Sequence, residues 1–246
     1  MNDVAVRIAG LAKRYGRQRV LAGVDLEVRS GEALGLVGAN GAGKTTLIKC
    51  LLDLCSSDAG RVEIYGVPGT LAAARRRLAY VPERFTPPHY LRCGEFLELV
   101  LELSGARLER AKAERLLGEL GLEPGVLDQP VRELSKGMTQ KLGLAACFLV
   151  ERDLYVLDEP MSGLDPVSRV AVKSVMLRLN REAKTLFFSS HVLADVEELC
   201  SSIAVLDRGR IRFRGAPAEL CARYSEPHLE RAFMRCLRGD EPLQRA

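Results

Sequence analysis

The fold is decided by one stretch of the sequence, Gly38-Ala39-Asn40-Gly41-Ala42-Gly43-Lys44-Thr45-Thr46. It follows a short apolar run, 34–37, and precedes a second apolar run that starts at Leu47. Strand, glycine-rich turn, Lys-Thr and helix, in this order, match the pattern G-x-x-x-x-G-K-[ST] in the structural context that the pattern requires. Glycines let the backbone amides of such a turn point inward and bind an anion at the N-terminus of a helix. The stretch therefore predicts a site for the phosphates of a nucleoside triphosphate.

The side chains of this loop have separate expected roles. We expect Lys44 to neutralise the β- and γ-phosphates and the hydroxyl of Thr45 to hold Mg²⁺. The residues of the loop that we expect to bind the nucleotide are Gly38, Asn40, Gly41, Ala42, Gly43, Lys44, Thr45 and Thr46. A chance glycine-rich turn is the plainer alternative, and it fits the combined motif and context poorly.

A pair of carboxylates, Asp158 and Glu159, follows the apolar run 154–157. In a parallel sheet the C-terminal ends of the strands line the ligand crevice. We expect Asp158 to bind Mg²⁺, usually through water, and Glu159 to orient or deprotonate the attacking water. An adjacent base favours hydrolysis over transfer to a second substrate. The alternative is an acidic helix cap or turn.

The apolar runs 154–157, 185–189 and 203–206 are short and are separated by helical patterning, which predicts a parallel α/β sheet. Segments 4–11, 20–28 and 61–65 look instead like antiparallel, edge-like strands. One helix is expected to begin at the N-cap Asp165, with Val167, Val170, Ala171 and Val175 on one face. Between Tyr80 and Val150 helical periodicity runs almost without strands, which predicts a helical lobe inserted into the α/β core.

Composition narrows the class of protein. The net charge of +4 is mild, with 36 basic residues interleaved among 32 acidic ones, so no nucleic acid is expected as a partner. Seven cysteines without a C-x-x-C pair, and no signal peptide, predict reduced thiols in the cytosol. The longest apolar run, 142–150, is shorter than the roughly 20 residues that a membrane-spanning helix needs. If the protein acts at a membrane, another chain must span it.

A further set of motifs makes a specific match. Leu134-Ser135-Lys136-Gly137-Met138 precedes an apolar helix and resembles the Leu-Ser-Gly-Gly-Gln signature of the nucleotide-binding subunits of ABC transporters, with departures at Lys136 and Met138. Ser135 and Gly137 match the signature residues that touch phosphate in that family. A serine and a glycine amide at a helix N-terminus also form a second anion site on physical grounds. Taken alone, Ser135 reads equally well as an ordinary helix cap.

One further motif and two single residues carry the resemblance, and one residue departs from it. Ser162-Gly163-Leu164-Asp165 resembles the D-loop of the family, and His191 resembles its switch histidine, which hydrogen-bonds the γ-phosphate. Tyr15 resembles the aromatic residue that stacks on adenine, and its alternative is a turn tyrosine. Glu83 stands where the family usually has a glutamine; a carboxylate can still bind Mg²⁺, and the alternative is a solvated loop residue.

The resemblance implies a fold and a division of the chain. The expected fold is α/β, a P-loop NTPase core with a mostly parallel sheet, an N-terminal antiparallel β subdomain and an inserted helical subdomain at about 84–150. The ATPase domain is expected over 1–225 and a C-terminal helix with a tail over 226–246. For that last helix the alternatives are a packed terminal helix and a basic helix that contacts a membrane surface.

The resemblance also implies a function. It predicts a subunit that hydrolyses ATP with Mg²⁺, forms a homodimer or a heterodimer with another ABC ATPase subunit, and drives a transmembrane permease on separate chains. Two such domains are expected to pack head to tail with two ATP molecules between them, on the cytoplasmic side of the inner or plasma membrane. The Pro82-Glu83 and Lys136-Gly137-Met138 forms favour an export type weakly. The alternative is a soluble ABC-type ATPase that acts in translation or DNA repair.

Overall fold

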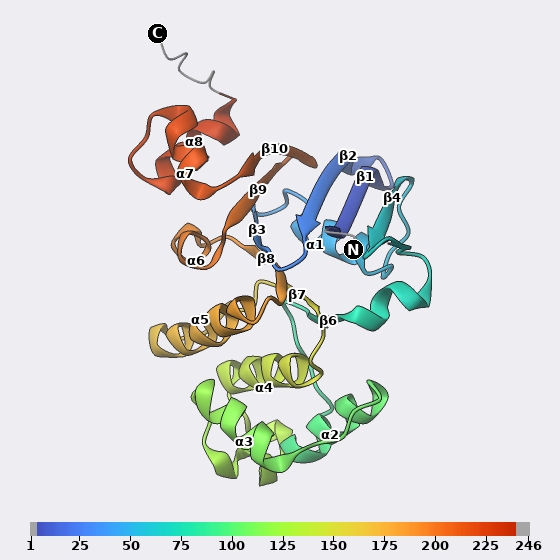
Figure 1. Cartoon of the computed structure of the whole chain (residues 1–246), viewed down its shortest axis with the longest axis vertical. Coiled ribbons are helices and arrows are strands. Elements are labelled where there is room, and N and C mark those ends of the chain that lie inside the picture. Colours follow the sequence, from blue (N-terminus) through green and yellow to red (C-terminus); the bar gives the residue numbers. More distant parts are fainter. Residues whose placement is uncertain (1–3, 240–246) are drawn as a thin grey trace.

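The strands form two sheets that differ in their pairing (Figure 1). The computed structural model describes residues 4–239. The first sheet is antiparallel and has the order β2-β1-β4-β5. Its strands are β1 (Val4–Tyr15), β2 (Gln18–Arg29), β4 (Ala59–Ile64) and β5 (Val67–Pro68). The expected N-terminal antiparallel sheet is confirmed, and β1 runs to Tyr15, beyond the end of the expected strand segment 4–11.

The second sheet has six strands in the order β10-β9-β3-β8-β7-β6. All neighbours are parallel except the hairpin partners β9 and β10, which confirms a mostly parallel sheet. The strands are β3 (Ala33–Val37), β6 (Leu78–Val81), β7 (Leu154–Asp158), β8 (Thr185–Ser190), β9 (Ser202–Asp207) and β10 (Arg210–Gly215). Every residue of β3 and β7 is buried, as expected for strands that are covered on both faces.

Two apolar cores lie on the two faces of this sheet. Alternation along β7 sends Tyr155 and Leu157 into one core and Leu154 and Val156 into the other. The core that holds Leu154 also contains the inward side chains of the antiparallel sheet and of α1 (Lys44–Leu51). The other core contains the buried faces of α5 (Pro166–Arg181), of α6 (Leu193–Leu199) and of the helical region. The six-stranded sheet thus separates a layer formed by the antiparallel sheet and α1 from a layer formed by α5, α6 and the helical region.

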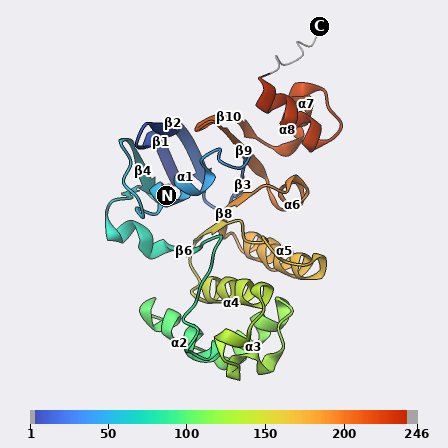
Figure 2. The same ribbon diagram turned by 180° about the vertical axis from the view of Figure 1, so that it is seen from behind.

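The helical region lies between β6 and β7 in the chain. It contains α2 (Cys93–Leu103), α3 (Arg110–Glu119), α4 (Lys136–Leu149) and the short 3₁₀ turns η2 (Pro124–Asp128) and η3 (Val131–Glu133). Another 3₁₀ turn, η1 (Ala72–Arg77), precedes β6. Figures 1 and 2 show α2, α3 and α4 together at one end of the molecule and α7 and α8 at the other. The strand β6 was not expected, because four residues are too short to show an alternating pattern.

The C-terminal helices are α7 (Pro217–Tyr224) and α8 (Leu229–Arg238). Leu229, Ala232 and Cys236 are buried in the core that α5 and α6 also contact, so α8 packs as a terminal helix. Residues 240–246 of the segment expected to form the tail lie outside the described residues. Within 4–239, no helix is long and apolar enough to cross a membrane.

The predicted face of α5 was wrong at its first turns. Val167 and Val170 are 80% and 59% exposed, whereas the buried residues of the helix are Val172, Val175, Met176 and Leu179. These four follow the spacing i, i+3, i+4 and i+7 of a single helix face. Val167 and Val170 lie outside that stripe, and only Val175 was assigned to the buried side correctly.

A matched pair of glycine substitutions tests the packing of the helical region. A Cβ on Gly143 of α4 would lie 2.7 Å from Cδ1 of Phe85, whose ring also packs edge-on against Phe96 at 5.7 Å. A Cβ on Gly118 of α3 would meet nothing within 4 Å. We expect Gly118→Ala to raise the free energy of unfolding by about 0.5–1 kcal/mol through helix propensity. We expect Gly143→Ala to lower it by about 1–3 kcal/mol, because overpacking outweighs that gain.

Urea titrations of both variants, followed by circular dichroism, measure these changes. An equal gain in stability for the two variants would show that Phe85 moves aside without cost, and would remove the packing role given to Gly143.

Candidate nucleotide-binding site

The turn 38–43 connects the end of β3 to α1, and close approaches require glycine at two of its positions, Gly38 and Gly43. A Cβ on Gly38 would lie 2.3 Å from the carbonyl oxygen of Leu206 in β9. Gly43 has a φ of +109°, and a Cβ there would lie 3.0 Å from the carbonyl oxygen of Val20. Gly43 is also the N-cap of α1, and no side chain accepts a hydrogen bond from the first turn. The N-terminus of this helix is therefore available to an anion.

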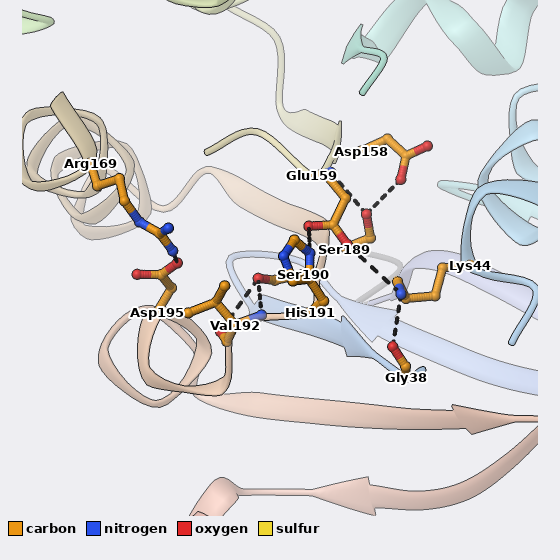
Figure 3. Close-up of polar contacts among 10 residues, drawn as sticks. All are labelled: Gly38, Lys44, Asp158, Glu159, Arg169, Ser189, Ser190, His191, Val192 and Asp195. Carbon is orange, nitrogen blue, oxygen red and sulfur yellow. Dashed lines mark hydrogen bonds and ion pairs between the residues drawn. The ribbon is translucent and has the colours of Figure 1, made fainter. Parts of the chain in front are cut away.

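Lys44 is a buried cation next to this turn. Lys44 is 8% exposed, and its Nζ donates a hydrogen bond to the carbonyl oxygen of Gly38 at 2.8 Å. The same Nζ lies 3.8 Å from Oε1 of Glu159 (Figure 3). A buried ammonium next to a carboxylate is stabilised by that charge, and the pair places one cation and one carboxylate at the mouth of the turn.

One pocket of about 440 Å³ brings most of the predicted site residues together. Segments far apart in the sequence form it: the end of β1, the turn 39–46, the loop after β6 and the ends of β7 and β8. Its lining includes Tyr15, Asn40, Gly41, Ala42, Gly43, Lys44, Thr45, Thr46, Glu83, Glu159 and His191. The size and the lining suit a ligand with several phosphates and a ring.

Asp158 and Glu159 are held by a hydroxyl from the neighbouring strand. Asp158 is 1% exposed, and the hydroxyl of Ser189 donates to its Oδ1 at 2.5 Å. The same hydroxyl accepts a hydrogen bond from the backbone N–H of Glu159 at 2.9 Å. Glu159 has a φ of 49°, a left-handed conformation that costs a non-glycine residue about 1–2 kcal/mol. The two adjacent carboxylates differ in position, because Glu159 lines the pocket whereas Asp158 is buried and does not belong to its lining.

Glu159 and His191 face each other across the ends of β7 and β8. Oε2 of Glu159 lies 2.8 Å from Nδ1 of His191, as Figure 3 shows. Because an ionised carboxylate only accepts hydrogen bonds, this contact assigns a proton to Nδ1. The side chain of Glu159 is 11% exposed, whereas that of His191 is 54% exposed. One carboxylate oxygen of Glu159 thus faces the Lys44 ammonium, and the other contacts the imidazole of His191.

Tyr15 lines the pocket, and Tyr80 lies on β6 in the lining of a different cavity. Tyr15 is 50% exposed, and its hydroxyl donates to Sγ of Cys55 at 3.7 Å. The Cys55 thiol, followed by burial, raises the pKa of Tyr15, so this phenol stays neutral with an exposed ring face. On β6, burial raises the pKa of Tyr80 to about 12, and the charge of Asp158 adds to that effect. Both rings are uncharged at neutral pH.

The signature residues Ser135 and Gly137 do not line this pocket. Ser135 is the N-cap of α4, and its hydroxyl accepts a hydrogen bond from the N–H of Met138 at 3.2 Å. Gly137 faces the turn after β7, where a Cβ would lie 3.6 Å from Cδ2 of Leu164. Lys136 lines a second cavity of about 510 Å³, which shares Glu83 with the nucleotide pocket. Within 4–239, the structure therefore places Ser135 and Gly137 on a second surface, apart from the phosphate loop.

Sequence reasoning missed two residues that organise the site. Ser189 connects Asp158 to the backbone of Glu159, and the buried Gln140 of α4 donates to the carbonyl oxygen of Pro160 at 3.2 Å. The pair Ser189-Ser190 at the end of an apolar strand is a signal that could have found the first. No pattern in the sequence points to Gln140, because its partner lies 20 residues away on another element.

Oxygen atoms dominate the donors that a cation could use here. The candidates are the hydroxyl of Thr45 and the carboxylates of Asp158 and Glu83, and oxygen ligands are those that Mg²⁺ prefers. Among residues 4–239 no group of three or more His, Cys, Asp or Glu residues could hold a metal ion by itself. The donor set fits an ion that is bound by few protein ligands and by phosphate oxygens.

Comparison with known proteins agrees with this geometry. The profile of the ABC transporter family matches residues 21–162. An uncharacterized ABC transporter ATP-binding protein of Synechocystis sp. is 38% identical over 204 residues, which cover 80% of this chain and 56% of that protein. This chain therefore spans little more than half the length of that relative. The Nod factor export ATP-binding protein I of Ralstonia nicotianae is 36% identical over 87% of this chain and 67% of its own length.

A solved structure shows the same fold. The ATP binding subunit of an ABC transporter superposes with a TM-score of 0.85 at 31% sequence identity, covering 94% of this chain and 99% of the other. Both of these relatives carry names of transporter ATP-binding proteins. From the matched profile, the relatives and the shared fold, this chain belongs to the ABC transporter family.

Proposed function

We propose that this chain is an ATP-hydrolysing motor subunit of an ABC transporter of the export type, which binds ATP with Mg²⁺ and drives a separate transmembrane permease. One observation carries the proposal. Lys44, Glu159 and His191, from three elements, line one pocket around the phosphate loop, with Glu159 between the other two. This is the arrangement that hydrolysis of a triphosphate needs: a cation for the charge, a base for water and a polar group at the far phosphate. The name of the Nod factor export relative supports the export type.

Each residue has a role in this proposal. The amides of the turn 38–43 and Lys44 bind the β- and γ-phosphates, and Tyr15 offers a ring face to adenine. Glu159 accepts the proton of the attacking water. His191 contacts the γ-phosphate through Nε2, which donates when the ring carries both protons. Thr45, Asp158 and Glu83 hold Mg²⁺, which offsets the negative charge of the phosphates when it is bound.

The position of Ser135 and Gly137 supports a dimer. Their surface at the N-terminus of α4 is a second anion site that this chain does not use on its own phosphate loop. In the proposed dimer each copy, or a related subunit, completes the pocket of its partner with this surface. Two ATP molecules then lie between the two subunits.

A groove on the helical region supports docking of the permease. It has a volume of about 810 Å³ and runs between β6, α2 and α4, with Phe96, Val100 and Cys147 in its lining. Leu103 belongs to this lining and is 81% exposed, and Arg75 and Arg76 border the groove. An apolar surface with a basic border fits a cytoplasmic segment of a membrane protein that carries apolar and acidic residues. The proposed location is therefore the cytoplasmic face of the membrane, through the permease.

The proposed division of the chain follows from these surfaces. Residues 1–225 form the ATPase domain, with the helical subdomain at about 84–150 as the part that meets the permease, and the C-terminal helix and tail begin at 226. The groove and the second anion site both involve this helical subdomain, whereas the phosphate loop belongs to the core.

Lys44→Ala tests the binding of the triphosphate. Loss of a buried charged contact should weaken the affinity for ATP by about 10- to 100-fold. Equilibrium titration with a fluorescent ATP analogue measures the change. Lys49→Ala is the matched control, because Lys49 is exposed in the last turn of the same helix, and its affinity should equal that of the unsubstituted protein. Equal affinities for all three proteins would contradict the central claim.

Glu159→Gln tests the chemical step. The amide keeps the size of the side chain and removes the base, so turnover should fall by about 10²-fold or more while ATP still binds. Phosphate release measures turnover, and light scattering measures the dimers that should accumulate with ATP. Glu98→Gln, at an exposed position on α2, serves as the control. Unchanged turnover of Glu159→Gln, measured with its membrane partner present, would remove Glu159 from the role of base.

Leu103→Asp tests the docking groove. A charge in the lining should abolish recovery of the permease when the tagged chain is purified from detergent-solubilised membranes of its source, with ATP affinity unchanged. Mass spectrometry identifies and quantifies the bound membrane protein. Met234→Asp on α8 is the control, because Met234 is 49% exposed on a helix at the opposite end of the molecule. Equal recovery with both variants would place the permease elsewhere.

A further inference from the structure

A buried ion pair lies beside the site and takes no part in binding the phosphates. Asp195, in the first turn of α6, is only 5% exposed, and Arg169 of α5 donates from Nη2 to its Oδ2. Nζ of Lys173, one turn further along α5, lies 3.8 Å from Oδ1 of the same carboxylate. Figure 3 shows the Arg169–Asp195 pair beyond the loop that carries His191. One buried carboxylate of α6 therefore receives two cations from α5.

An ion pair between two helices stabilises their packing less efficiently than apolar contacts do. Burying the Asp195 carboxylate and partly burying the Arg169 guanidinium is unfavourable, and apolar side chains of similar size often hold helices together as well or better. Buried charge pairs of this kind are better explained by a requirement for one defined geometry, because a guanidinium and a carboxylate fix both distance and direction.

The ion pair lies between the loop that follows β7 and the loop that follows β8. Arg169 and Asp195 line a cavity of about 80 Å³ together with Glu159, the turn 160–163 and the loop 190–192. The backbone N–H of Arg169 donates to the carbonyl oxygen of Asp165, the N-cap of α5, so Arg169 is tied to the end of the loop that follows β7. Asp195 lies in the first turn after the loop that follows β8. The pair therefore joins the two loops that carry Glu159 and His191.

His191 needs such support from outside its own loop. Its side chain is 54% exposed, and its hydrogen bond is to Glu159. The loop itself is held locally by Ser190, whose hydroxyl accepts from the N–H of Val192 at 3.0 Å. This local turn sets the shape of the loop, and it leaves open the distance from His191 to the β7 loop. The β7–β8 pairing and the Ser189 hydroxyl fix the strand ends, and contacts between α5 and α6 add to them where the loops leave the sheet. The ion pairs of Asp195 with Arg169 and Lys173 are polar contacts of this kind.

We infer that Arg169 and Asp195 are positioning residues for ATP hydrolysis: their ion pair fixes the β7 loop against the β8 loop and thereby holds Nδ1 of His191 at hydrogen-bond distance from Glu159. This inference rests on the proposed function. The pair does not belong to the lining of the nucleotide pocket, so we expect it to set the rate of the chemical step and to leave the binding of ATP unchanged.

The test compares full-length variants at Arg169 with a control on the same helix. Arg169→Met removes the guanidinium and keeps the length of the side chain, and the protein should still fold because Lys173 remains beside Asp195. Arg169→Lys keeps the charge. The control is Arg178→Met, because Arg178 also pairs with two carboxylates, at 2.8 and 3.2 Å, on the exposed part of α5.

Three measurements are made on each variant: kcat, the affinity for ATP and the thermal midpoint. We expect kcat of Arg169→Met to fall by about 10- to 100-fold, which a misplacement of about 1 Å can cause. Affinity should stay within about threefold, since the phosphate contacts remain. Arg169→Lys should recover most of kcat, and Arg178→Met should leave it unchanged. If Arg169→Met lowers kcat no more than Arg178→Met does, or weakens ATP binding as much as it slows turnover, the pair has no positioning role.

A spectroscopic readout separates positioning from general stability. The chain has three histidines, His89, His191 and His228, so the imidazole nitrogens can be followed one by one by NMR of ¹⁵N-histidine-labelled protein. The Nδ1 signal of His191 should move in Arg169→Met and in Asp195→Asn, and stay in place in Arg169→Lys and Arg178→Met. The signals of His89 and His228 should not move in any variant. An unmoved His191 signal in Arg169→Met overturns the inference whatever the loss of stability.

Glu159→Gln, measured in the same assay, keeps this inference distinct from the proposed function. If Glu159→Gln retains turnover, the proposed hydrolytic role of Glu159 fails. If Glu159→Gln abolishes turnover and Arg169→Met does not lower it, the proposed function stands and the positioning role fails.

Discussion

The parallel pairing of β7 with β8 is the constraint on which the rest of the site depends. Its register sets Asp158 opposite Ser189, and the pairing of β3 with β8 sets Val37 opposite Ser190. Three strands therefore end at one edge, where the phosphate loop, the two carboxylates and His191 begin. A shift of one residue would turn Ser189 to the other face of the sheet and leave Asp158 buried without its hydrogen bond. The apolar runs of these strands specify the register, because both faces of the sheet are packed.

The site concentrates charge in a place where a stable core would have none. Lys44, Asp158, Glu159 and Asp195 are each less than a tenth exposed. Each is partly compensated: Lys44 by a carbonyl oxygen and Glu159, Asp158 by Ser189, and Asp195 by two cations of α5. Such compensation rarely recovers the full cost of desolvation, and groups held in this way cluster at functional sites. The left-handed backbone of Glu159 adds strain at the same place. The surrounding sheet, with two apolar cores, is what offsets these costs.

The parts of this structure that depend on neighbouring residues could be predicted from the sequence. The phosphate loop, the carboxylate pair after an apolar strand and the N-cap Asp165 are local patterns, and the structure places them as expected. The parts that depend on distant partners could not. Ser189, Gln140 and the Arg169–Asp195 pair gain their meaning from residues 20 to 31 positions away. A related reason explains why the sequence did not predict the exposure of Val167 and Val170 or the short strand β6. Apolar composition alone does not show which face of a helix is covered or which segment pairs as a strand.

The connection from β6 to β7 has a mechanical consequence. Because these strands are parallel, the chain leaves the sheet at the edge that carries the phosphate loop and returns at the opposite edge, so the helical region is a crossover that no tight turn could replace. Its returning end is anchored, since Asp153 pairs with Arg77 and with Lys184 at 2.8 and 3.8 Å. Its leaving end, at the exposed Glu83, opens on the nucleotide pocket. The two ends of the helical region therefore differ, because Asp153 is held by ion pairs and Glu83 lines the pocket. A ligand in that pocket would therefore lie beside the helical region at the point where the chain leaves β6.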